Sequence, residues 1–238
     1  MNLGYACINT ALSANKIFTN RTMRRKTFDA NGEDYVSDLA LANIKDLKTI
    51  VQWNNEMKIK LFRLSSQIFP WSDEYDIKDL KDYNEIAELM LEIGKIAKDA
   101  GQRLTMHPGP YNCLASPTQK VVEKTIRELN FHSEQFNMMG YDPSPYNKIN
   151  IHVGGAYGDK KGTLDAFCHN FKLLNEDTKK RLVIENDDSP NEYSVNDLYW
   201  GIHKRIGIPI TFDYFHHKFN TGTLTEEEAL RMAATTWP

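Results

Sequence analysis

The chain has 238 residues, of which 41% are hydrophobic, and its formal net charge is −3. This length can bury the core of one large domain or two small ones, and the small negative charge excludes a protein that coats nucleic acid by bulk positive charge. No apolar run reaches the roughly 18 to 20 residues that span a bilayer, and the start MNLGYACINTALSANK lacks the order of a secretory signal, so we expect an intracellular protein without a membrane partner.

Short apolar segments alternate along the chain with longer amphipathic ones, and Gly, Pro, Asn and Asp stand at the joints. The predicted strands cover residues 3–8, 59–64, 103–107, 149–153, 181–185 and 208–213. The predicted helices cover residues 36–53, 80–100, 118–138, 164–174 and 194–207. This alternation predicts an α/β fold with a parallel sheet, either doubly wound or closed as a (β/α) TIM-type barrel. No linker divides residues 1–238, which favours a single domain.

Polar residues stand where four of the predicted strands end. "LTMH" ends on His107, "INIHVGG" carries His152, "LVIEND" reaches Glu185, and "IPITFDYFHH" reaches Asp213 followed by His216. In a barrel the carboxyl ends of all strands converge on one face, where side chains distant in sequence meet.

A single histidine at a strand end is usually a structural residue held by hydrogen bonds. Four such residues crowded together would cost several kcal/mol in desolvation and repulsion, a penalty that a cation removes. Imidazole and carboxylate ligands together suit Zn²⁺ or Mn²⁺, and Glu185 could bridge two ions. The strand ends therefore predict a shared metal site at one face of the sheet.

The stretch "RLTMHPGPYN" places a rigid turn directly after the predicted ligand His107. Pro108, Gly109 and Pro110 would present Tyr111 above the site, although Tyr111 could equally serve only to cap the barrel.

Two basic stretches also stand out. One holds Arg21, Arg24, Arg25 and Lys26, and the other holds Lys160 and Lys161; they suit flanking phosphates but could also be solvated surface.

These segments resemble the UV damage endonucleases, a TIM-barrel family related in fold to endonuclease IV. The resemblance runs in order through "LGYACIN", "NRTMR", "FRLSSQIFPW", "RLTMHPGPY", "IHVGGAYGDK", "LVIENDD" and "DYFHHKFNTG", and so covers nearly the whole chain.

The resemblance implies metal-dependent incision of the DNA backbone on the 5′ side of UV photoproducts, namely cyclobutane pyrimidine dimers and 6-4 photoproducts, and sometimes of abasic sites. It implies up to three divalent ions, a partner in UV-damaged double-stranded DNA, and a monomer located in the cytoplasm or wherever the genome is repaired. The metal ligands would be His107, His152, Glu185, Asp213 and His216, and of these Glu185, His107 and His152 are expected to be catalytic.

The resemblance also assigns residues that contact the lesion. Tyr5 and Asn9 match positions that line the lesion pocket, and Tyr111 matches one of two residues that wedge into the duplex when the damaged dinucleotide is flipped out. Arg21, Arg24 and Lys160 are then expected to hold DNA phosphates.

Three features depart from the family pattern. Pro110 stands where the family has the second wedge residue, a glutamine. Glu74 replaces a metal-site histidine and could still bind the metal, although it changes the charge of the site. The family also continues beyond "TW" with strands that supply a lysine, two histidines and a glutamate, so we expect an incomplete barrel at the C-terminal end, fewer than three ions and weak incision or none.

Two other functions remain open on the sequence. A sugar-isomerase-like barrel also gathers His, Glu and Asp around divalent metals, although "NRTMRR" and "HPGPY" suit phosphate binding and duplex wedging better than a closed sugar pocket. A shortened relative could also bind damaged DNA without cutting it.

Overall fold

Six short strands alternate with helices in the part of the chain that the computed structural model describes, residues 3–238. The strands are β1 Gly4–Ala6, β2 Leu61–Leu64, β3 Arg103–Met106, β4 Ile149–Ile151, β5 Leu182–Glu185 and β6 Ile210–Thr211. The α-helices are α1 Thr10–Ser13, α2 Arg25–Glu56, α3 Tyr83–Asp99, α4 Gln119–Met138, α5 Lys160–Phe171, α6 Glu176–Arg181, α7 Val195–Leu198, α8 Lys204–Ile206, α9 Tyr214–Phe219 and α10 Glu226–Ala234. Two 3-10 turns, η1 Ile77–Asp79 and η2 Pro145–Asn147, and a π-helix, η3 Tyr199–His203, complete them. The predicted α/β class with alternating elements is confirmed.

The chain divides into two compact units, one formed by residues 3–107 and 131–147 and the other by 108–130 and 148–238. In the first unit β2 pairs in parallel with β1 and with β3, and in the second β5 pairs in parallel with β4 and with β6. None of the helices within residues 3–238 is both long and apolar enough to cross a membrane.

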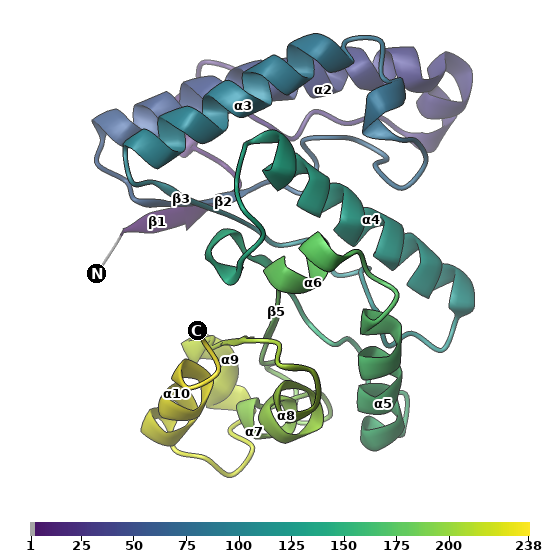
Figure 1. The fold of residues 1–238 in the computed structure, drawn as a ribbon, viewed down its shortest axis with the longest axis vertical. Helices are drawn as coiled ribbons and strands as arrows, with labels where there is room; N and C mark the ends of the chain where they lie inside the picture. The colour runs from purple at the N-terminus through teal and green to yellow at the C-terminus, as the bar shows by residue number, and fades with distance from the viewer. Residues whose placement is uncertain (1–2) are drawn as a thin grey trace. The chain divides into compact units, whose positions relative to one another are not determined.

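The core of the first unit lies where α2 and α3 pack side by side and cover its three strands (Figure 1). Buried apolar residues recur every three or four positions on both helices, and β2 and β3 contribute residues with no exposure at all. The fully buried apolar residues are Val36, Ala40, Ile44, Leu47, Ile50 and Val51 on α2, Ile86, Met90, Ile93 and Ala97 on α3, and Phe62, Leu64, Leu104 and Met106 on the strands. Each large aliphatic side chain removed from water stabilises the fold by about 1.5–3 kcal/mol.

Helix α2 begins at Arg25, eleven residues before the predicted start at residue 36. Gly32 interrupts it with φ 61° and ψ −156°, a left-handed backbone that glycine adopts without steric cost. The first buried apolar position of α2 is Val36, after this kink. The sequence pattern therefore showed only the part of the helix that packs on the core.

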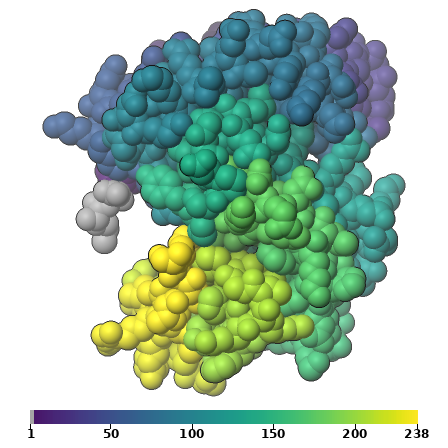
Figure 2. Space-filling model, in the orientation of Figure 1, coloured from purple at the N-terminus to yellow at the C-terminus, as the bar shows by residue number. Residues whose placement is uncertain are grey.

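The second unit holds β4, β5 and β6 together with the helices that follow them. Ser194 caps α7 through a reciprocal pair of contacts with Asp197, and Gly207 ends α8 with φ 76°, as its sequence predicts. The π-helix between these two ends was not predicted. Helix α10 packs on α7 and β6, and Figure 2 shows its yellow residues in continuous contact with the yellow-green residues of the same unit.

Candidate metal centre

The carboxyl ends of β4, β5 and β6 carry the candidate site of the second unit. His152 follows the last residue of β4, Glu185 is the last residue of β5, and Asp213 stands two residues after β6. The register pairs Ile151 with Ile184, so its continuation by one residue places His152 level with Glu185. Since the strands are parallel, these side chains emerge at the same edge of the sheet.

Glu185, Asp213 and His216 each offer a ligand atom within 4.8 Å of the others. Local structure produces this proximity, because Asp213 is the N-cap of α9 and His216 lies in its first turn. Oδ1 of Asp213 accepts hydrogen bonds from the backbone N–H groups of Phe215 at 2.7 Å and His216 at 2.9 Å. Asn186, which is fully buried, also pairs with Asp213 by accepting from its backbone N–H at 2.8 Å and donating to its carbonyl at 3.1 Å.

The two candidate histidine ligands of the second unit, His152 and His216, are oriented through the same ring nitrogen. Nδ1 of His216 lies 2.7 Å from the backbone carbonyl of Asn186, and Nδ1 of His152 lies 2.7 Å from Oδ1 of Asp187. A partner that accepts a proton from Nδ1 fixes the tautomer whose Nε2 lone pair can bind a metal. The two ring centroids are 5.5 Å apart, so both imidazoles belong to one cluster.

Glu185 is held in a buried position beside these rings. Its side chain accepts a hydrogen bond through Oε2 from Nδ2 of Asn150, while Oε1 lies 3.7 Å from Nδ1 of His216. Glu185 is only 7% exposed and Asn150 only 4%. A buried carboxylate with one oxygen occupied by an amide presents the other oxygen in a fixed direction.

The charge of the cluster is negative. Burial lowers the pKa of His152, but the carboxylates of Asp187, Glu185 and Glu192 outweigh it and raise that pKa overall. Burial and the carboxylates of Asp187 and Asp188 raise the pKa of Glu192. Carboxylates thus favour a positive partner at this place, and a divalent cation bound by imidazole and carboxylate groups supplies one.

The other two predicted ligands lie in the first unit. His107 follows β3 directly and is partly exposed. Glu74 accepts a hydrogen bond and ion pair from Arg25, with 2.7 Å between Oε1 and Nη1. The guanidinium of Arg25 also lies over the ring of Trp71, at 5.4 Å from its centroid. Arg25 therefore contacts both the carboxylate of Glu74 and the ring of Trp71.

Tyr5 and Asn9, which the sequence places in a lesion pocket, lie against each other. The hydroxyl of Tyr5 donates to Oδ1 of Asn54 at 2.7 Å and accepts from Nδ2 of Asn9 at 2.8 Å. Asn9 in turn caps α1 through Oδ1, at 3.0 Å from the backbone N–H of Leu12. The pair is therefore rigid, with its polar atoms already in contact with protein groups.

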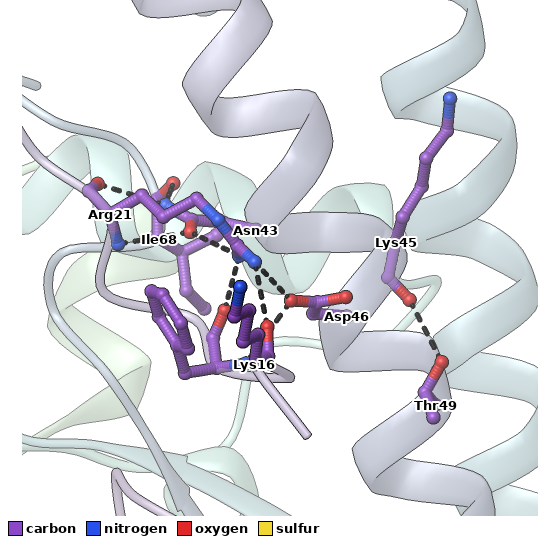
Figure 3. A network of polar contacts seen from close by, with 8 residues as sticks. Lys16, Arg21, Asn43, Lys45, Asp46, Thr49 and Ile68 are labelled. Carbon is purple, nitrogen blue, oxygen red and sulfur yellow. Dashed lines mark hydrogen bonds and ion pairs between the residues drawn. The ribbon is translucent and has the colours of Figure 1, made fainter. Parts of the chain in front are cut away.

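The two arginines expected at DNA phosphates have different surroundings. Arg21 donates to the carbonyl of Phe18 at 2.6 Å and to Asp46 at 2.7 Å, within the network that Figure 3 shows around Asn43. Asn43 is fully buried and donates to the carbonyls of Arg21 at 3.1 Å and Ile68 at 3.0 Å. The side chain of Arg21 thus ties segments of its own unit together, whereas Arg24 is exposed at the start of α2.

Three further residues with an expected role in DNA binding lie in the second unit. Tyr111 is 89% exposed at the turn that includes the exposed Pro110. Lys160 begins α5, where Nζ lies 3.2 Å from the carbonyl of Pro190 and 3.6 Å from Oδ2 of Asp197.

The structure adds Asn150, Asn186 and Asp187 to the site. Asn150 had a signal in the sequence, because a polar residue in an apolar strand two positions before His152 points to the same face. Asp187 accepts from the backbone N–H of Tyr193 at 3.3 Å, and its other oxygen contacts His152. His217, which follows the candidate ligand His216, is buried with 3% exposure.

Comparison with known proteins places these features in a family. A model of the UV-endonuclease UvdE family matches residues 1–238. A UV-damage endonuclease from Schizosaccharomyces pombe is 38% identical over 233 residues, which are 94% of this chain but only 37% of that protein's length. The chain therefore spans well under half of this relative.

Solved structures agree. The crystal structure of SacUVDE matches with a TM-score of 0.88 at 32% identity, over 100% of this chain and 77% of that one. A D-psicose 3-epimerase from Clostridium cellulolyticum H10 matches with a TM-score of 0.57 at 13% identity, over 80% of this chain and 65% of that one, and shows a shared fold alone. Both neighbours are TIM barrels, which confirms the predicted (β/α) barrel class. The chain belongs to the UV-endonuclease UvdE family.

Proposed function

We propose that this chain is a metal-dependent DNA repair endonuclease that cuts the phosphodiester backbone on the 5′ side of UV photoproducts. The observation that carries the proposal is the cluster of Glu185, Asp213 and His216, whose ligand atoms lie within 4.8 Å of one another in a chain of the UvdE family. We further propose UV-damaged double-stranded DNA as the partner and a monomer folded as one barrel domain.

The donor set fits a divalent metal. Imidazole nitrogen and carboxylate oxygen together suit Mn²⁺ or Zn²⁺, and neighbouring groups hold these side chains in place. His152, Glu185, Asp213 and His216 would hold the ion or ions, and His107 is proposed as a further ligand from its place at the end of β3. Oε1 of Glu74 pairs with Arg25, so Glu74 is proposed to bind an ion through its other carboxylate oxygen.

Divalent ions bound at this place would stabilise negative charge on the reacting phosphate and lower the pKa of a water. The chain's own residues have other tasks. Asp187 and the carbonyl of Asn186 keep protons on Nδ1 of His152 and His216, and Asn150 holds one oxygen of Glu185. We propose that Tyr111, which directly follows Pro110 in the turn after β3, enters the duplex while the damaged dinucleotide leaves the stack.

Phosphate and lesion contacts complete the proposal. Arg24 and Lys160 are proposed to hold flanking phosphates, and Arg21 to support that surface through its contacts with Asp46 and Phe18. Tyr5 and Asn9 are proposed to present a preformed hydrogen-bonding pair to the lesion.

The test uses the 238-residue chain with a duplex that carries one cyclobutane dimer and a label at one end. We expect a weak nick directly 5′ to the dimer that requires Mn²⁺, that EDTA abolishes, and that does not occur on the intact duplex. Glu185→Gln should remove both the nick and the bound metal, as measured by elemental analysis of the same preparation. Binding to damaged duplex without any metal-dependent nick would leave a damage-binding protein, and no preference for damaged DNA would overturn the proposal.

A further inference from the structure

A pocket of the second unit, of about 470 Å³, lies between the loops that follow β4 and β5. Gly155, Tyr157 and Lys160 line it from the loop after β4, and Ser189, Asn191 and Glu192 line it from the loop after β5. These loops begin at the candidate ligands His152 and Glu185. Both loops thus connect the pocket to the strand ends that carry the candidate metal centre.

Tyr157 is presented to this pocket in an unusual conformation. Its backbone has φ 50°, a left-handed value that side chains other than Gly, Asn and Asp rarely adopt, and its side chain is 56% exposed. Such backbone conformations persist where the surrounding structure enforces them, and they cluster at binding sites.

The side chain of Tyr157 is held by contacts at its ring and at its hydroxyl. A Cβ added to Gly155 would lie 3.6 Å from the ring, so the ring rests over this glycine. The hydroxyl lies 3.5 Å from Sγ of the buried Cys113, which itself lies 3.3 Å from the carbonyl of Val153. Gly154 is needed beneath this arrangement, because its φ is 96° and a Cβ there would approach Sγ of Cys113 to 2.5 Å. The tyrosine is therefore a fixed aromatic platform.

Polar groups flank the platform on both loops. Nζ of Lys160 is held 3.2 Å from the carbonyl of Pro190 and lies over the ring of Tyr193, at 5.7 Å from its centroid. Glu192 is partly buried on the opposite loop and its carboxylate is an acceptor. An aromatic plane, a cation and a hydrogen-bond acceptor around one pocket are the groups that bind a nucleotide.

We propose that this pocket binds one unstacked nucleobase of the DNA strand that the metal centre cuts. The base stacks on Tyr157, its phosphate approaches Lys160, and Glu192 accepts a hydrogen bond from an exocyclic amino group, as carboxylates do from cytosine. The inference rests on the proposed endonuclease function and adds a base-binding site to it. It predicts a preference for a base with an amino group beside the cut.

The test compares the full chain with three variants by fluorescence anisotropy on a labelled duplex that carries one dimer, in EDTA so that no cutting occurs. Tyr157→Asn keeps a residue that tolerates the left-handed backbone but removes the ring, and Tyr157→Phe keeps the ring but removes the hydroxyl. Trp200→Ala removes another exposed aromatic ring of the same unit, 62% exposed and lining a different pocket.

We expect Tyr157→Asn to weaken binding about ten-fold or more, the value of one base stacked on an aromatic ring. Tyr157→Phe and Trp200→Ala should stay within about two-fold of the unchanged chain, and thermal unfolding of all four proteins checks that each is folded. Equal binding by Tyr157→Asn and the unchanged chain would overturn the pocket assignment. If the unchanged chain itself showed no preference for the damaged duplex, the endonuclease proposal would fail instead, so the two failures are distinguishable.

Discussion

Nδ1 of His152 lies 2.7 Å from Oδ1 of Asp187, and the other oxygen of the same carboxylate accepts the backbone N–H of Tyr193 at 3.3 Å. Asp187 is 6% exposed, so its two oxygens are committed to two fixed directions. One side chain therefore joins the loop after β5 to the histidine after β4, and its carboxylate favours a proton on Nδ1, which would leave Nε2 of that histidine to bind a metal.

Asp187→Asn should lower metal affinity about 10- to 100-fold, the usual cost of removing such a partner. If the amide oxygen keeps its bond to Tyr193, the amide NH₂ faces Nδ1 of His152 and favours the tautomer that carries its proton on Nε2. That tautomer cannot bind a metal through Nε2. Competition with a chelating indicator measures the affinity for Mn²⁺ or Zn²⁺.

Asp188→Asn is the matched control, since it makes the same change of charge at the next, exposed residue. It should bind metal like the unchanged chain. Equal affinities for the two variants would mean that Asp187 does not position His152.

Asn150→Asp should destabilise the metal-free protein by about 1–3 kcal/mol, because it places a second carboxylate beside the buried Glu185. Bound metal offsets this repulsion, so the difference from the unchanged chain should shrink when Mn²⁺ replaces EDTA. Thermal unfolding in both conditions tests the prediction.

Asn175→Asp makes the same change of charge at an exposed helix start and serves as the control. It should unfold like the unchanged chain in both conditions. A loss of stability in Asn150→Asp that Mn²⁺ leaves unaltered would contradict a role for Asn150 at the metal centre.

The sequence revealed the strand ends, because a charged or imidazole group after an apolar run is visible without a structure. It placed His152, Glu185 and Asp213 correctly at the carboxyl ends of β4, β5 and β6. It did not reveal the partners of these residues. The bond from Asn150 to Glu185 depends on the register of β4 against β5, which one sequence does not encode in any local pattern.

Arg21 illustrates a different limit. A cluster of cations in a sequence suggests a surface for phosphates, but the guanidinium of Arg21 bonds to Asp46, twenty-five residues away on α2. Such a contact arises only when the chain folds back on itself. Arg24, three residues later, remains exposed, so neighbouring residues of the same type have different roles.

The contrast between Arg21 and Arg24 gives a third prediction. Arg21→Ala should lower the free energy of unfolding by about 2 kcal/mol, because it removes charge-assisted hydrogen bonds to Asp46 and Phe18. Arg24→Ala should leave the free energy of unfolding within about 0.5 kcal/mol and instead weaken DNA binding, with a smaller dependence on salt. Urea unfolding and binding at several salt concentrations separate the two. Equal stability of both variants would mean that the contacts of Arg21 in Figure 3 contribute nothing measurable.

The last prediction concerns Tyr111. Because its side chain is 89% exposed, Tyr111→Ala should change the free energy of unfolding by no more than about 0.5 kcal/mol. If the ring enters the duplex when the damaged bases leave the stack, the same variant should lose about 1–3 kcal/mol of discrimination between damaged and intact DNA. Tyr111→Phe keeps the ring and should discriminate like the unchanged chain. Competition binding with damaged and intact duplexes measures the difference, and an Ala variant that discriminates normally would return Tyr111 to the role of an exposed cap, since its loss would then affect neither folding nor recognition.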